Sequence, residues 1–304
     1  MKTCLLSFAD YREPAERLAH CLDLPYAEIS LHRFPDGESR VQLPVTNADH
    51  LLICRSLDNP NNKLIELMLT AATARDMGIK QLSLVAPYLC YMRQDIAFHA
   101  GEAVSQKIVG RYLAAQFDNI ITVDPHLHRT SNLHEAVPCR QAISLSASNI
   151  LGEFLVSHNR PYVLIGPDEE SRQWVSEVAA VGGFRFEIAT KSRLSDRQVE
   201  VILSDLNVRG ADVILVDDMI STGHTLLEAT KILYTQGAAS VNCLVTHALH
   251  SQEVIEMLQA AGVDTIWSTD SILHDSNCIH LAKLLATGVK LLMDAQACRN
   301  HPIL

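Results

Sequence analysis

The segment VILVDDMISTGHTL, residues 213–226, decides the fold. Its first four residues form a continuous apolar run, which is typical of a strand buried on both faces of a parallel sheet. Two adjacent acids and a small, hydroxyl-rich turn follow, and a helical pattern of apolar residues then runs over 225–236 and stops at Gly237. The segment therefore predicts a strand, a turn and a helix, the repeating unit of an α/β sheet.

The turn lies at the N-terminus of the predicted helix, where free N–H groups and the helix dipole favour a phosphate. The two acids end the strand, where open α/β sheets place ligands. Carboxylates repel a phosphate, so they suit the hydroxyls of a sugar or a magnesium ion. The segment thus predicts a ribose 5-phosphate site, and the alternative is solvated acids beside Ser and Thr residues that cap the helix. The residues expected to hold the sugar phosphate are Asp217, Asp218, Ser221, Thr222, Gly223, His224 and Thr225.

The same order of strand, polar turn and helix recurs along the chain and predicts an α/β fold. Alternating strands and helices indicate parallel sheets with helices on both faces. We expect two doubly wound parallel-sheet domains, 1–145 and 146–304, because the Pro- and Ser-containing stretch 137–150 is a suitable join. Helical patterns are clearest at 62–77, 103–117, 171–182, 225–236, 252–261 and 278–287.

The composition is that of a folded chain with two cores. The 304 residues are 48% hydrophobic and 20% charged, and no apolar run approaches the roughly 18 residues of a membrane span. The N-terminal MKTCLLSFAD resembles a first strand more than a signal peptide. The eight cysteines form no CxxC pair, so we expect reduced thiols in a cytoplasm. A net charge of -10 argues against bulk nucleic acid as a partner.

Two clusters in the first half of the chain suit a nucleotide. In RFPDGESRVQL, 33–43, Phe34 offers a flat surface for a base and the acids can accept from an amino group, although the turn is equally an ordinary loop. In YMRQD, 91–95, Arg93 presents a fork for phosphate oxygens or forms a surface ion pair.

Three further clusters have both a functional and a structural interpretation. His126 and His128 stand two apart, but no third ligand follows at zinc spacing, so a histidine serving magnesium or hydrogen-bonded loop histidines are the alternatives. The acids Asp168, Glu169 and Glu170 open a helix and can be ordinary partners of its dipole; Asp168, nearest the strand end, is the best ligand candidate among them. The polar stretch 190–201 is either an exposed hairpin or a mobile loop that closes over phosphates.

Segment 213–226 resembles the phosphoribosyl-diphosphate (PRPP) loop of type I phosphoribosyltransferases and of PRPP synthases. Over nearly its whole length the chain resembles the ribose-phosphate diphosphokinases, which are the PRPP synthases. The matching segments, in the family's order, are RFPDGE (33–38), NNKLIELML (61–69), PYLCYMRQD (87–95), TVDPHLH (122–128), GPDEES (166–171), KSR (191–193) and VTHALHS (245–251).

This resemblance implies two domains of the type I phosphoribosyltransferase kind. It implies a magnesium-dependent transferase of the cytoplasm that feeds nucleotide biosynthesis: ATP and ribose 5-phosphate give PRPP and AMP. It also implies a homo-oligomer in which a neighbouring subunit lends adenine contacts. The implied roles are ATP binding for Phe34, Asp36, Gly37, Glu38, Arg93 and Gln94, magnesium binding for His126 and Asp168, catalysis for Lys191 and Arg193, and ribose 5-phosphate binding for Asp217 and 221–225.

The chain departs from the family's common pattern in its loops. Ser221 stands where many bacterial and animal synthases carry Asp, and His224 where a second Gly is common. The segment FHAGEAVSQK, 98–107, lacks the usual basic pair and is more like archaeal-type synthases. Phosphate activation and ADP inhibition are therefore not implied.

Two other functions fit part of the sequence. A phosphoribosyltransferase would consume PRPP, but it leaves the DGE and RQD segments unexplained. A non-catalytic paralogue that binds nucleotides and regulates a true synthase would explain them without turnover. The sequence leaves open the oligomer size and whether another pentose phosphate is the acceptor.

Overall fold

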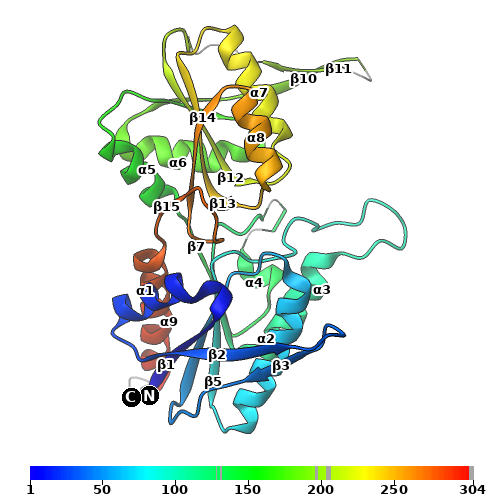
Figure 1. Ribbon diagram of the computed structural model, residues 1–304, viewed down its shortest axis with the longest axis vertical. Coiled ribbons are helices and arrows are strands. Elements are labelled where there is room, and N and C mark those ends of the chain that lie inside the picture. The colour runs from blue at the N-terminus through cyan, green and yellow to red at the C-terminus, as the bar shows by residue number, and fades with distance from the viewer. Residues whose placement is uncertain (128, 131, 196–197, 203–206, 301–304) are drawn as a thin grey trace. The chain divides into compact units, whose positions relative to one another are not determined.

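The computed structural model describes residues 1–127, 129–130, 132–195, 198–202 and 207–300, with the backbone alone for 190–202 and for 296–300 (Figure 1). Its contacts group the chain into two compact units. The N-terminal unit comprises 1–145 and 280–304, and the C-terminal unit comprises 146–279. This grouping differs at the chain end from the expected division, which placed 146–304 in one domain.

The N-terminal unit contains a seven-stranded sheet in the order β3-β2-β1-β4-β5-β6-β7. All neighbouring strands are parallel except β2 and β3, which form an antiparallel hairpin at one edge. The strands are β1 (Thr3–Phe8), β2 (Tyr26–Arg33), β3 (Ser39–Gln42), β4 (His50–Cys54), β5 (Gln81–Ala86), β6 (Asn119–Val123) and β7 (Gln141–Leu145).

Helices cover both faces of this sheet (Figure 1). Helix α1 packs against α9, and α2 packs against α3. The helices are α1 (Arg12–Leu22), preceded by the 3-10 turn η1 (Ala9–Tyr11), α2 (Pro60–Asp76), α3 (Ser105–Gln116), α4 (Leu133–Ala136) and α9 (Ala282–Asn300).

The C-terminal unit contains a six-stranded, all-parallel sheet in the order β15-β14-β13-β12-β8-β9. Its strands are β8 (Val163–Gly166), β9 (Arg185–Ile188), β12 (Asp212–Ile220), β13 (Ser240–Ala248), β14 (Val263–Thr269) and β15 (Asn277–Ile279). A separate two-stranded sheet pairs β10 (Thr190–Ser195) with β11 (Gln198–Ile202).

Two pairs of helices flank the six-stranded sheet, α5 with α6 and α7 with α8 (Figure 1). The apolar run Val213–Val216 is fully buried in β12, where Leu215 pairs with Ile165 of β8 and with Cys243 of β13. A strand enclosed in this way needs apolar side chains on both faces, as the sequence predicted. The helices are α5 (Ser148–Ser157), α6 (Arg172–Gly182), preceded by η2 (Glu169–Ser171), α7 (His224–Thr235) and α8 (Gln252–Ala260).

The end of the chain is where the sequence pattern misleads. A helix was expected over 278–287, but Asn277–Ile279 form the edge strand β15, and the helix begins only at Ala282. Helix α9 then packs on α1, β6 and β7, so its apolar side belongs to the N-terminal core. The periodicity indicates a helix and cannot indicate which sheet the helix covers.

Candidate active site

The turn that joins β12 to α7 has a shape that only glycine fits. Gly223 has φ of +72°, in the left-handed region. A Cβ atom there would lie 2.7 Å from Cγ1 of Val254 in α8. Glycine is therefore required both by the backbone conformation and by the close approach of the neighbouring helix.

The N-terminus of α7 carries no side-chain cap. Gly223 is the N-cap residue and makes no side-chain hydrogen bond to the helix. The alternative in which Ser or Thr occupies the N-cap position is thus not what the structure has. Thr222 and His224 are exposed on either side of Gly223, and Nδ1 of His224 lies 3.2 Å from the carbonyl oxygen of Thr222. The first-turn N–H groups of α7 have the geometry of an anion site.

Three carboxyl groups gather near this turn. Asp217 and Asp218 lie within β12, which runs on to Ile220, and Asp168 follows the adjacent strand β8. Burial, and then the charges of Asp218 and Asp168, raise the pKa of Asp217 well above its usual range. The backbone N–H of Asp218 donates to Oδ1 of Asp217 at 2.9 Å. This edge of the sheet therefore favours a ligand that brings hydroxyl donors or positive charge.

The stretch with Lys191 and Arg193 forms a hairpin. Lys191 pairs with Val201 and Arg193 with Val199, and the register shifts between Arg193 and Ser195. Figure 1 shows β10 and β11 as a narrow extension beside α7. The side chains of Lys191 and Arg193 lie outside the described part of the structure.

In the N-terminal unit, Phe34 to Glu38 form the tip of the β2–β3 hairpin. The N–H of Phe34 donates to the carbonyl of Glu38 at 2.8 Å, and the N–H of Gly37 donates to the carbonyl of Phe34 at 2.9 Å. Gly37 has φ of +92°. The tip is thus closed by its own backbone, while the Phe34 side chain remains 41% exposed and Asp36 and Glu38 face solvent.

The loop after β5 places Arg93 and Gln94 differently. Arg93 is exposed, as a phosphate-binding side chain should be. The carboxamide oxygen of Gln94 accepts from the N–H of Ser105 at 2.5 Å, and its nitrogen donates to the carbonyl of Ile96 at 3.1 Å. In the structure, Gln94 therefore holds this loop to the start of α3.

His126 follows β6, at the same edge of the sheet, and is half-buried. An ion pair between Arg129 and Asp95, 2.7 Å long, joins the loop after β6 to the loop after β5. This ion pair links the two loops that carry the candidate residues Arg93, Gln94 and His126. His128, the second histidine of this motif, lies outside the described residues.

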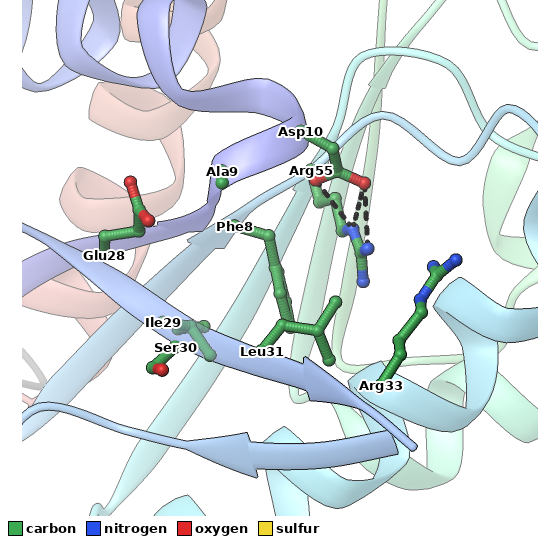
Figure 2. Close-up of a pocket in the computed structure, with 9 residues that line it drawn as sticks. All are labelled: Phe8, Ala9, Asp10, Glu28, Ile29, Ser30, Leu31, Arg33 and Arg55. Atoms are coloured by element: carbon green, nitrogen blue, oxygen red, sulfur yellow. Dashed lines mark hydrogen bonds and ion pairs between the residues drawn. The ribbon is translucent and has the colours of Figure 1, made fainter. Parts of the chain in front are cut away.

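The sequence motifs did not predict a charged network that lies at the centre of the N-terminal sheet (Figure 2). Strands β1 and β4 lie side by side where the strand order reverses, which is the usual ligand position in open α/β sheets. Arg55 follows β4 and is fully buried; its Nη2 lies 2.8 Å from Oδ2 of Asp10 and 2.7 Å from Oε2 of Glu66. Its guanidinium carbon lies 3.8 Å from the centroid of Phe8.

The network borders a cavity of about 360 Å³, which is large enough for a small ligand. Figure 2 shows the Arg55 side chain pointing toward Leu31, with Arg33 on the other side of Arg55 from Phe8. The only sequence signal was the position of Glu66 within the matching segment 61–69.

A second buried network lies in the segment VTHALHS, 245–251, at the end of β13. His247 Nδ1 lies 2.9 Å from Oγ of Ser271, and that hydroxyl donates to the carbonyl of Thr246 at 2.8 Å. All three residues are buried. Burial, and then the neighbouring His274, lower the pKa of His250 in the same segment to about 4. The segment ends β13, which runs to Ala248, and leads into α8 from the carboxyl edge of the sheet.

Comparison with known proteins gives this arrangement a family. Residues 3–116 match the model of the N-terminal domain of ribose phosphate pyrophosphokinase, and residues 130–272 match that of the phosphoribosyl transferase domain. A ribose-phosphate pyrophosphokinase of Methanopyrus kandleri is 36% identical over 277 residues, covering 90% of this chain and 94% of the relative. The chain belongs to the ribose-phosphate pyrophosphokinase family.

Other members of the family agree with this assignment. The ribose-phosphate pyrophosphokinase of Methanothermobacter thermautotrophicus is 33% identical and covers 91% of this chain and 96% of its own length. The phosphoribosylpyrophosphate synthetase of Mycobacterium smegmatis has the same fold, with a TM-score of 0.81, 22% identity and coverage of 97% of this chain and all of that chain. The predicted family and fold class are confirmed.

Among the described residues, no helix is long and apolar enough to cross a membrane. Within the same residues, no three His, Cys, Asp or Glu side chains form a cluster that could hold a metal ion.

Proposed function

We propose that this chain transfers the diphosphoryl group of ATP to the anomeric hydroxyl of ribose 5-phosphate, giving PRPP and AMP. The observation that carries the proposal is that one chain contains both the N-terminal domain of the synthase family and a phosphoribosyl transferase domain. A phosphoribosyltransferase needs only the second half, with its sugar-phosphate turn. The first half, with the RFPDGE hairpin and the RQD loop, matches the synthase model and supplies a reason for ATP.

In this proposal the C-terminal unit binds ribose 5-phosphate. The uncapped start of α7 and the hydroxyls of Ser221, Thr222 and Thr225 receive the 5-phosphate, with Gly223 and His224 shaping the turn. Asp217 and Asp218 accept from the ribose hydroxyls. Such bonds suit Asp217 in particular, because donors would stabilise the charge of a carboxylate that burial and the neighbouring acids disfavour.

The N-terminal unit binds ATP. Phe34 stacks on adenine, and Asp36 and Glu38 accept from its amino group, with Gly37 forming the turn. Arg93 pairs with phosphate oxygens, while Gln94 contacts ATP and holds the loop that carries Arg93. Because the hairpin tip is exposed, we propose that it completes the site of a neighbouring subunit.

Magnesium fits the donors that these residues offer. The ion keeps several waters and binds through one or two carboxylates and substrate phosphates, so a complete protein cage is not required. His126 and Asp168 are the residues proposed to hold it. Bound magnesium supplies positive charge at the phosphate oxygens.

The proposed transfer forms one bond and breaks one. The anomeric oxygen bonds to the β-phosphorus and releases its proton to solvent, and the bond from that phosphorus to the oxygen shared with the α-phosphate breaks. AMP leaves with the bridging oxygen. Charge spreads over the phosphoryl oxygens, where Lys191 and Arg193 are proposed to stabilise it.

The assay that tests the function is the identification of the nucleotide product. With ATP, ribose 5-phosphate and magnesium we expect AMP and PRPP in equal amounts, measured by chromatography. A panel of pentose phosphates identifies the preferred acceptor. ADP as the product refutes the proposed reaction. No product with any sugar phosphate also refutes it and leaves the non-catalytic paralogue as the explanation.

The shared adenine site is tested by mixing two inactive variants. In the proposed arrangement, Phe34→Ala damages the active site of the neighbouring subunit, to which the hairpin contributes. Lys191→Ala damages the active site of the subunit that carries the substitution. If the site is shared, subunits exchanged between the two variants form some sites with neither defect, so activity returns. Sedimentation should show a homo-oligomer. No recovery after verified exchange, or an active monomer, contradicts a shared site.

Replacing Asp217 should weaken sugar phosphate binding selectively. Loss of a hydrogen bond to a charged group costs roughly 1.5–3 kcal/mol. Asp217→Ala should therefore raise the dissociation constant of ribose 5-phosphate by on the order of ten- to a hundredfold, with ATP binding nearly unchanged, by calorimetry. Asp212→Ala is the matched control, since Asp212 begins the same strand and pairs with Arg160 at 3.3 Å. Equal losses for both ligands mean that Asp217 is structural or holds metal.

A further inference from the structure

We infer that Glu66 is a positioning residue for adenine: its carboxylate clamps the base of the β2–β3 hairpin and thereby fixes the tip that carries Phe34, Asp36 and Glu38. The inference rests on the proposed adenine role of that tip. It assigns a function to a buried side chain of α2 that touches no substrate.

The clamp acts on both strands of the hairpin. Oε1 of Glu66 accepts from Nη2 of Arg33 at 3.3 Å and from Oγ of Ser39 at 3.1 Å. Arg33 is the last residue of β2, Ser39 is the first of β3, and the two are register partners. They are therefore the last pair before the tip, so one carboxylate oxygen holds the hairpin where its orientation is set.

The other oxygen of Glu66 is anchored at the centre of the sheet. Oε2 lies 2.7 Å from Nη2 of Arg55. Arg55 is in turn held by Asp10, through Nε at 3.1 Å and Nη2 at 2.8 Å, and by the ring of Phe8 (Figure 2). Glu66 thus connects the fixed strands β1 and β4 to an edge hairpin.

The hairpin needs such a connection. β3 is an edge strand of four residues that pairs with β2 alone. The bonds within the tip fix its shape but not its direction. An adenine contact must be placed to within about 1 Å to be effective.

The burial of the Glu66 carboxylate has a free-energy cost that an apolar side chain at the same position would not have. Glu66 is completely buried, and apolar residues in place of a buried ion pair are often as stable or more so. A carboxylate at this position is useful because it accepts hydrogen bonds from Arg33 and Ser39 and also forms an ion pair with Arg55, which no apolar side chain can do. We infer that this ion pair contributes to a defined geometry of the hairpin more than to stability.

The test compares Glu66→Gln with Arg75→Gln in the full-length oligomer. Arg75 is a matched control because it also lies on α2 and forms an ion pair, with Asp118 at 2.8 Å, away from the hairpin. The first measurement is hydrogen exchange of the peptide 31–42. The second is the KM and the dissociation constant for each substrate, ATP and ribose 5-phosphate.

We expect Glu66→Gln to speed exchange at the hairpin and to raise the KM and dissociation constant for ATP by about tenfold or more, with the ribose 5-phosphate constants unchanged. Arg75→Gln should change none of these. If Glu66→Gln does not fold, Ser39→Ala keeps every charge and removes one donor, and it should cause a smaller change in the same direction.

Unchanged exchange in a folded variant overturns the clamp. Faster exchange with unchanged ATP constants overturns the positioning role. If the wild-type protein binds no ATP, the proposed function and the adenine role fail together. The wild-type measurement alone reveals this outcome, which distinguishes it from the two outcomes for the Glu66 variant.

Discussion

Lys191→Ala and Arg193→Ala should each lower the turnover number by about a hundred- to a thousandfold, as is found for other preorganised electrostatic groups. The two residues lie in β10, in a hairpin that forms its own two-stranded sheet. We propose that they meet the phosphates mainly when charge develops during transfer. An interaction made mainly in the transition state lowers turnover with little change in ground-state binding.

The measurements that accompany turnover separate catalysis from folding. The midpoint of thermal unfolding and the dissociation constant for ribose 5-phosphate should remain close to those of the wild type. Arg197→Ala is a matched control, because Arg197 belongs to the same basic stretch but falls outside the KSR segment. Normal turnover in both variants removes the catalytic assignment. Unfolding of both would instead mean that these side chains are structural.

The local parts of the fold could be predicted because their causes are local. The apolar run at 213–216 indicated a buried parallel strand, and β12 is one. The strand nevertheless continues through Asp217 to Ile220, because the backbone ladder to β13 forms whichever side chains the strand carries. The turn required a glycine, but its close contact with Val254 of α8 depends on a helix that begins 29 residues later.

The features that escaped prediction depend on residues far apart in the sequence. Arg55 and Asp10 are separated by 45 positions, and no spacing rule joins them. Helix α9 had the expected period, but its packing against α1 follows from the tertiary fold. Gln94 was expected to contact ATP, and its bond to the start of α3 became visible only in the structure. Sequence motifs identified the groups at the site, and the structure identified the residues that support them.

Arg55→Met should lower the free energy of unfolding by about 3–5 kcal/mol, because it leaves the buried carboxylate of Glu66 without its main partner. Among the described residues, Glu66 would keep Arg33 as its cationic partner, at 3.3 Å, and the Arg33 side chain is 55% exposed. Asp10 is less affected, since it is partly exposed and lies 3.6 Å from Nζ of Lys63. Denaturant unfolding at neutral pH measures the loss.

The double variant Arg55→Met, Glu66→Met then separates stability from position. Apolar residues of similar volume can replace a buried ion pair with little or no loss, so the double variant should recover most of the free energy of unfolding. It has no carboxylate for Arg33 and Ser39, so its affinity for ATP should remain low. Recovery of both stability and ATP affinity would show that the network only fills the core. Recovery of neither would mean that the charges are required for folding itself, since an apolar pair of similar size could not replace them.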